Sequence, residues 1–130
     1  KVIQADQNLR AELSALPQPK WIFTNASRQH ANTVLELLGI ADLFNGVIDV
    51  LDTDPWCKPQ PEAFEIALRL AGSPDPAVTM FVDDLETNLD AARKLGLQTL
   101  RISAEEVESK HPVINALAEL PAFLSKNGIN

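Results

Sequence analysis

The chain has 130 residues, a length typical of a single domain, and 45% of them are hydrophobic, as in ordinary globular proteins. Its net charge of −7 and the lack of any run of Lys or Arg argue against a surface for polymeric nucleic acid or for anionic membranes. Cys57 is the single cysteine, so no internal disulfide can form, and we expect a reducing, cytoplasmic location. No apolar stretch of the sequence reaches the length of a transmembrane helix.

Short apolar runs alternate with helical patterns along the chain. Helices are predicted where apolar residues recur at helical spacing: 6–16, 29–38, 62–71, a stretch that begins after the acids at 83–84 and ends at 95, and 113–125 with a kink at Pro121. Strands are predicted over the apolar runs 21–23, 47–51, 78–82 and 97–102. This alternation favours a parallel sheet with helices on both faces, so the predicted fold class is a three-layer α/β/α, Rossmann-like domain over residues 1–130.

The stretch from Met80 to Asn88 places two adjacent acids between a strand and a helix. Asp83 and Asp84 follow the apolar run directly, and open parallel sheets bind their ligands at this carboxyl edge. Neighbouring carboxylates repel each other, so they need a cation, a proton or ample water. Mg²⁺ shared with a phosphate is the functional interpretation. The alternative is an exposed N-cap, for which Asp is also favoured.

Two further polar groups follow predicted strands. Thr24 and Asn25 come directly after the strand at 21–23, and Lys58 lies in the loop that leaves the strand at 47–51. A hydroxyl, an amide, an ammonium and a carboxylate pair at one sheet edge suit phosphoryl transfer, because they can bind phosphate oxygens and neutralise the charge that develops there. Each has a structural alternative: Thr24 and Asn25 could simply cap a helix, and Lys58 could be a solvated lysine.

Three segments, in this order, resemble motifs II, III and IV of the haloacid dehalogenase (HAD) superfamily: Phe23-Thr24-Asn25, then Cys57-Lys58-Pro59 with Pro61-Glu62-Ala63-Phe64, then Phe81-Val82-Asp83-Asp84 with Asn88. The resemblance extends from about Asp6 to Ile102. Within the superfamily, the sequence around Trp21 and His30 is similar to that of the pyrimidine 5′-nucleotidase branch.

The resemblance implies a Mg²⁺-dependent phosphomonoesterase with an aspartyl-phosphate intermediate. It implies that Thr24 and Asn25 bind the phosphate. Lys58 would bind phosphate as well and act with Thr24 in catalysis, by steadying the nucleophile and the phosphoryl charge. Asp83 and Asp84 would hold the Mg²⁺. The implied substrate is a small phosphorylated metabolite, with a pyrimidine nucleotide as one candidate.

The chain departs from the superfamily at motif I. The nucleophile and the general acid of the superfamily form an Asp-x-Asp pair at the end of the first strand, and no such pair follows an apolar strand upstream of Thr24. Asp6 does not substitute for it. The chain therefore looks like the C-terminal part of such an enzyme, lacking motif I and most of the cap, and we expect it to be inactive alone. The alternative is a non-catalytic folded fragment, or a binding or dimerisation module.

The missing motif I strand would leave an open position between the strands that carry Thr24 and Asp83. Unpaired backbone groups at that position would cost on the order of several kcal/mol in total. We expect the two strands to pair directly, or a homodimer in which a second copy supplies a strand. A third solution is that Lys1 to Gln4 fills the gap.

The remaining polar residues give weaker signals. His30, early in the second helix, is interpreted as a solvated histidine. His111, before Pro112, is predicted to start a helix. Cys57 has no histidine near it in the sequence and is not predicted to be a nucleophile. Trp56 is interpreted as a loop anchor, with stacking on a base as the alternative.

Overall fold

The computed structural model describes residues 5–129, and they form two compact units, which are described separately. Unit 1 consists of residues 5–50 and 117–129, and unit 2 of residues 51–116. None of the described helices is both long and apolar enough to cross a membrane.

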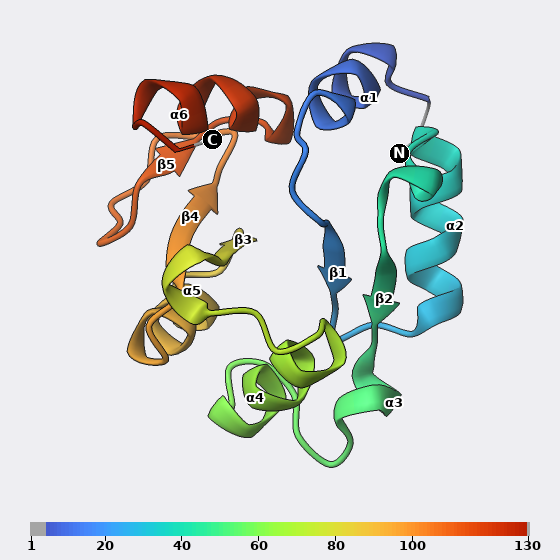
Figure 1. Ribbon diagram of the computed structural model, residues 1–130, viewed down its shortest axis with the longest axis vertical. Coiled ribbons are helices and arrows are strands. Elements are labelled where there is room, and N and C mark those ends of the chain that lie inside the picture. The colour runs from blue at the N-terminus through green and yellow to red at the C-terminus, as the bar shows by residue number, and fades with distance from the viewer. Residues whose placement is uncertain (1–4, 130) are drawn as a thin grey trace. The chain divides into compact units, whose positions relative to one another are not determined.

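Unit 1 is a pair of parallel strands with helices packed around it. Its elements are α1 (Gln7–Ser14), β1 (Trp21–Phe23), α2 (Arg28–Leu38), the 3-10 turn η1 (Ala41–Leu43), β2 (Gly46–Ile48), the 3-10 turn η3 (Leu117–Glu119) and α6 (Leu120–Lys126). The two strands pair in parallel, with Trp21 opposite Gly46 and Phe23 opposite Ile48. α2 runs alongside β2, and α6 packs with α1 (Figure 1).

Local sequence signals start and stop the helices of unit 1. Asp6 caps α1, where its Oδ1 accepts the backbone N–H of Leu9 at 2.9 Å, and Ser27 caps α2. Gly39 ends α2 with a φ of 75°, the left-handed conformation that favours glycine. The end predicted for this helix, at residue 38, is therefore confirmed.

The core of unit 1 forms where α1 meets the residues around the end of α2. Its buried members are Leu9, Leu13, Leu35 and Ile40. Leu117 and Ala118 from η3 pack against this cluster. Since burying a leucine or isoleucine side chain contributes roughly 1.5–3 kcal/mol, this cluster is the main apolar contribution to the stability of unit 1.

Unit 2 is a three-stranded parallel sheet with helices. Its elements are α4 (Pro61–Leu70), the 3-10 turn η2 (Pro76–Val78), β3 (Met80–Asp83), α5 (Glu86–Lys94), β4 (Gln98–Ile102) and β5 (Val113–Ile114), while α3 (Val50–Thr53) lies at the junction with unit 1. The strand order is β3-β4-β5, all parallel, and α5 packs on β3 and β4 (Figure 1). The predicted α/β class with parallel strands and helices is confirmed.

Two of the predicted elements are wrong in part. The strand predicted over 47–51 ends at Ile48, and Val50 opens the short helix α3. The helix predicted over 113–125 is three elements instead: β5, η3 and α6. The β-branched pair Val113 and Ile114 extends the sheet beside β4, and Pro121 lies in the first turn of α6, where a proline is favoured, instead of kinking a longer helix.

The sheets of the two units are separate in their hydrogen bonding. Among the described residues, β1 pairs with β2, and the ladders of the other sheet join β3 to β4 and β4 to β5. The predicted direct pairing of β1 with β3 is not among these ladders. Lys1 to Gln4, the third solution considered for the gap, lies outside the described residues. A strand supplied by a second copy stays a prediction, as does the grouping of residues 1–130 into one domain.

Candidate active site

The acid pair lies where β3 ends and α5 is about to begin. Asp83 is the last residue of β3, and its Oδ1 accepts the backbone N–H groups of Asp84 at 2.6 Å and Leu85 at 3.1 Å. Leu85 is the N-cap residue of α5 and makes no side-chain cap bond. The carboxylate of Asp83 therefore holds the turn itself, which fixes its position at the carboxyl edge of the sheet.

Lys58 and Asp83, 25 residues apart in the sequence, form an ion pair inside unit 2. Lys58 Nζ lies 3.2 Å from Asp83 Oδ2, and each side chain is only 9% exposed. The ammonium also lies 5.4 Å from the centroid of the Phe81 ring, within the range of a cation–π interaction. The buried Asn88 donates from Nδ2 to the same Asp83 oxygen at 3.2 Å. The structure thus brings together the predicted lysine and the predicted acid pair.

The pKa values of the two acids are shifted in opposite directions. Burial alone would raise the pKa of Asp83, but the hydrogen bond with Asp84 and the charge of Lys58 outweigh it, so the pKa is lowered. The hydrogen bond with Asp83, followed by burial and the charge of Asp83, raises the pKa of Asp84. The two shifts go in opposite directions, so Asp84 takes up a proton before Asp83 does as the pH falls.

Thr24 and Asn25 belong to unit 1, at the carboxyl end of β1. The backbone N–H of Thr24 donates to Ile48 O at 3.0 Å, and its Oγ1 accepts the N–H of Ala26 at 2.9 Å. These two bonds fix the hydroxyl just beyond the ladder of β1 and β2. Since Lys58 and Asp83 belong to unit 2, a meeting of the four residues around one phosphate stays a prediction.

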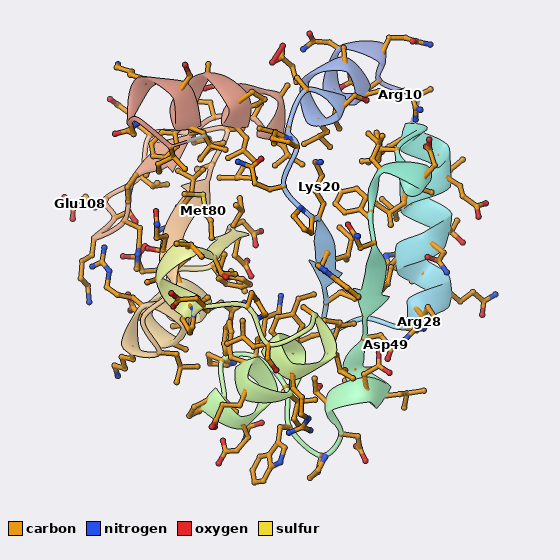
Figure 2. The ribbon with its side chains drawn as sticks, viewed as in Figure 1. Arg10, Lys20, Arg28, Asp49, Met80 and Glu108 are labelled. Atoms are coloured by element: carbon orange, nitrogen blue, oxygen red, sulfur yellow. The ribbon has the colours of Figure 1, made fainter. Side chains whose placement is uncertain are left out.

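Asp49 is a polar residue of this sheet edge that the sequence reasoning missed. It follows β2 directly, is buried, and its Oδ2 accepts the backbone N–H of Arg28 at 3.0 Å, at the start of α2 (Figure 2). The predicted strand over 47–51 placed Asp49 in mid-strand and so concealed it. The available signal was the same as for Asp83, an acid at the end of a short apolar run.

A second polar network in unit 2 was also missed. The ring of His111 is fully buried, with Nδ1 2.7 Å from Thr99 Oγ1 and Nε2 2.8 Å from Asp90 Oδ1. The prediction that His111 starts a helix is wrong: it precedes β5 and joins that segment to α5 and β4. Its sequence neighbours gave no sign of this, because both partners are more than ten positions away.

Glu86, in the first turn of α5, is the acceptor at the centre of the same region. Its Oε1 accepts from Ser109 Oγ at 2.6 Å and from Arg101 Nη1 at 3.0 Å, and its Oε2 accepts the backbone N–H of Lys110 at 2.9 Å. Glu86, Asp90 and His111 place potential metal-ligand atoms within 4.8 Å of one another. The donors already bonded to Glu86 and the His111–Asp90 bond account for these groups as a structural network.

The lowered pKa of Glu86 predicts that the stability of the fold depends on pH. The N–H of Lys110, the hydroxyl of Ser109 and then Arg101 lower its pKa to about 2. Because the pKa is lower in the folded chain, the stabilisation is complete above the ordinary glutamate pKa near 4.5 and is lost as the pH falls from there toward 2. Thermal melts between pH 5 and pH 2.5 should therefore show a steeper loss of stability for the wild type than for Glu86→Gln. Equal slopes for the two proteins would contradict this assignment.

Comparison of the sequence with models of known protein families identifies the family of this chain. The sequence model of the haloacid dehalogenase-like hydrolases matches residues 5–96, a stretch that contains Thr24, Lys58 and the acid pair. The chain belongs to this hydrolase family. The expected HAD superfamily membership is thus confirmed, while the nucleotidase branch stays a prediction.

The similar proteins include a sequence relative and solved structures with the same fold, and their names refer to different activities. Phosphate metabolism protein 8 of Saccharomyces cerevisiae is 34% identical over 107 residues, which cover 73% of this chain and 33% of the yeast protein. The L-2-haloacid dehalogenase of Xanthobacter autotrophicus superposes with a TM-score of 0.75 at 22% identity, covering 92% of this chain and 58% of that one. The HAD hydrolase YfnB of Bacillus subtilis, solved bound to magnesium, gives a TM-score of 0.76 at 22% identity, covering 88% and 53%. The HAD-like chain therefore spans about a third of the yeast protein and somewhat more than half of each solved chain.

Proposed function

We propose that this chain is the C-terminal part of a Mg²⁺-dependent phosphomonoesterase that acts on a small phosphorylated metabolite. The observation that carries the proposal is the buried pair of Lys58 and Asp83, with Asp84 beside it, at the end of β3. A dehalogenase is the other chemistry represented among the structural neighbours. Two adjacent carboxylates at the end of a parallel strand favour the phosphatase, since a hard cation relieves the repulsion between them.

Each side chain of the proposed site has a defined task. Asp83 and Asp84 would hold the Mg²⁺, which when bound supplies positive charge to a phosphate oxygen. Lys58, kept beside Asp83 by the ion pair, would neutralise charge on the transferred phosphoryl group. Thr24 would donate its hydroxyl to a phosphate oxygen and Asn25 would complete that side of the pocket. Asn88 keeps Asp83 in place.

The donor set fits the proposed metal. Carboxylate oxygens are the ligands that Mg²⁺ prefers, and it commonly binds through one or two carboxylates together with substrate phosphate and water. Asp83 already has a lowered pKa and is ionised at neutral pH. Asp84, directly after it in the sequence, would supply a second carboxylate oxygen to the metal.

The chain by itself is proposed to be inactive, because the 130 residues contain no Asp-x-Asp pair after an apolar strand upstream of Thr24. The alternative proposal is a non-catalytic folded module, with a second copy of the chain as a possible partner. The name of the yeast relative, a phosphate metabolism protein, supports the phosphatase over the alternative. A pyrimidine nucleotide is the substrate candidate suggested by the resemblance of Trp21 to Ala26 and of His30.

Calorimetric titration with Mg²⁺ tests the metal site. We expect the 130-residue chain to bind Mg²⁺, and Asp83→Asn to weaken that binding by more than about tenfold, because removal of a ligand costs at least as much as removal of a group that supports one. Asp75→Asn is the matched control, since Asp75 caps η2 in the same unit and asparagine caps equally well. Equal affinities for the two variants would contradict the assignment of Asp83.

A phosphatase assay with p-nitrophenyl phosphate tests the predicted inactivity. The pure chain should give no turnover above a buffer control, with or without Mg²⁺. Robust Mg²⁺-dependent turnover that Asp83→Ala abolishes would overturn the proposal that a nucleophile is missing. Absence of both turnover and Mg²⁺ binding would favour the non-catalytic module.

A further inference from the structure

We propose that Glu86 is a positioning residue: by binding Arg101, it keeps the guanidinium away from Asp83 and Asp84, so that the acid pair retains the negative charge needed for a divalent cation. This inference rests on the metal site of the proposed function. It assigns a role in that site to two residues that belong to none of the motifs in the sequence.

Arg101 lies in the strand next to the acid pair. Asp83 and Arg101 are register partners in the ladder that joins β3 to β4. Adjacent strands lie about 4.8 Å apart, which is less than the length of an arginine side chain, and partner residues lie on the same face of the sheet. Without another acceptor, a guanidinium at this position can reach the carboxylate of Asp83.

The observed guanidinium is bonded elsewhere and has donor capacity to spare. Arg101 Nη1 lies 3.0 Å from Glu86 Oε1 and 3.4 Å from the backbone oxygen of Glu108. Its Nε is buried and has no hydrogen-bond partner among the described residues. Because a buried donor without a partner is unfavourable, we expect the guanidinium to move to the carboxylate of Asp83 or Asp84 if that of Glu86 is removed.

Glu86 is held in place independently of Arg101. Ser109 Oγ and the backbone N–H of Lys110 bind its two oxygens at 2.6 and 2.9 Å. Both donors come from the segment before β5. The carboxylate is therefore anchored on one side by this segment and presents its remaining acceptor capacity to Arg101.

The arrangement distributes two cations between two acidic groups. Lys58 pairs with Asp83, and Arg101 pairs with Glu86. One ammonium beside Asp83 and Asp84 leaves the ionised pair with a net negative charge. A second cation would cancel it and would repel a metal ion. The assignment of Arg101 to Glu86 is thus what leaves the pair able to bind a cation.

Four variants test this by Mg²⁺ titration: Glu86→Gln, Arg101→Gln, the double variant, and Glu62→Gln as a control for loss of an exposed acid at the start of a helix in the same unit. Glu86→Gln should weaken Mg²⁺ binding by about fivefold or more, the size of one unscreened charge at contact distance in water. The double variant should bind within about twofold of Arg101→Gln, because the released cation is absent. Glu62→Gln should match the wild type.

Recovery of Mg²⁺ binding in the double variant distinguishes a positioning role of Glu86 from a merely structural one. If the double variant binds as weakly as Glu86→Gln, or if Glu86→Gln binds as well as the control, the inference is overturned. Glu86→Asp, which keeps the charge but withdraws it from Arg101, is the second variant if Glu86→Gln does not fold, with the same loss and the same rescue expected.

A crystal structure of the Glu86→Gln variant tests the inference without metal. It should show the Arg101 guanidinium in contact with Asp83 or Asp84, and a guanidinium left in its original place would overturn the inference. If the wild type binds no Mg²⁺, the metal site of the proposed function fails, and this structure still decides where Arg101 goes.

Discussion

Lys58→Met is expected to lower the free energy of unfolding by about 3 kcal/mol, because it removes one partner of a buried ion pair and leaves the other uncompensated. The two side chains are each 9% exposed, so solvent screens the pair poorly. Methionine keeps the length of the apolar stem, so the loss reports the charge. Because unit 1 contains Trp21 and unit 2 contains Trp56, urea unfolding followed by fluorescence in a Trp21→Phe background reports unit 2.

Lys110→Met is the matched control for this measurement. Lys110 also faces an aspartate in unit 2, Asp90, but at 3.8 Å and with its side chain 73% exposed. Exposed pairs of this kind are worth at most about 0.5–1 kcal/mol. If Lys58→Met costs no more than Lys110→Met, the Lys58–Asp83 pair is not the buried contact described above.

Phe64→Ala is expected to cost about 3–5 kcal/mol, the range for a large aromatic residue truncated in a core. Phe64 lies on α4, is 2% exposed, and meets the Phe81 ring edge-on at a centroid distance of 5.1 Å. Phe81 in turn lies under the ammonium of Lys58. The truncation should therefore loosen Lys58 as well as the core, which hydrogen exchange at β3 would report together with urea unfolding.

Leu70→Ala provides the comparison within the same helix. Leu70 is the last residue of α4 and is 47% exposed, so its truncation should change stability by only about 0.5 kcal/mol. A similar cost for both truncations would mean that the Phe64–Phe81 contact does not organise unit 2.

The elements predicted well from the sequence are those whose signals are local. β1 follows its apolar run residue for residue, and the start of α2 depends on a serine cap. The motif III and motif IV residues were recognised from local sequence patterns. In the structure, Lys58 in the loop before α4 contacts Asp83 at the end of β3, within the same unit. For β1 and the start of α2, the nearest ten residues carry the information.

The features that the sequence did not predict depend on distant partners. Ile114 reads as part of a helix unless β4 is known to lie beside it. His111 looks like an ordinary loop histidine until Thr99 and Asp90 are placed around it. Glu86 looks like a common first-turn acid, and only the fold shows that it accepts from three donors, Arg101 in β4 and Ser109 and Lys110 before β5.

The division of unit 1 into two stretches has a consequence for biosynthesis. Part of the cover over the leucines of α1 comes from Leu117 and Ala118 of η3, which is made roughly a hundred residues later. At about 5–20 residues per second, the ribosome leaves that part of the face uncovered for roughly 5–20 s, whereas unit 2, a single uninterrupted stretch, is fully synthesised before η3 is translated. The nascent chain therefore exposes part of the apolar face of α1 to aggregation, and depends on chaperones there, while unit 2 is being synthesised.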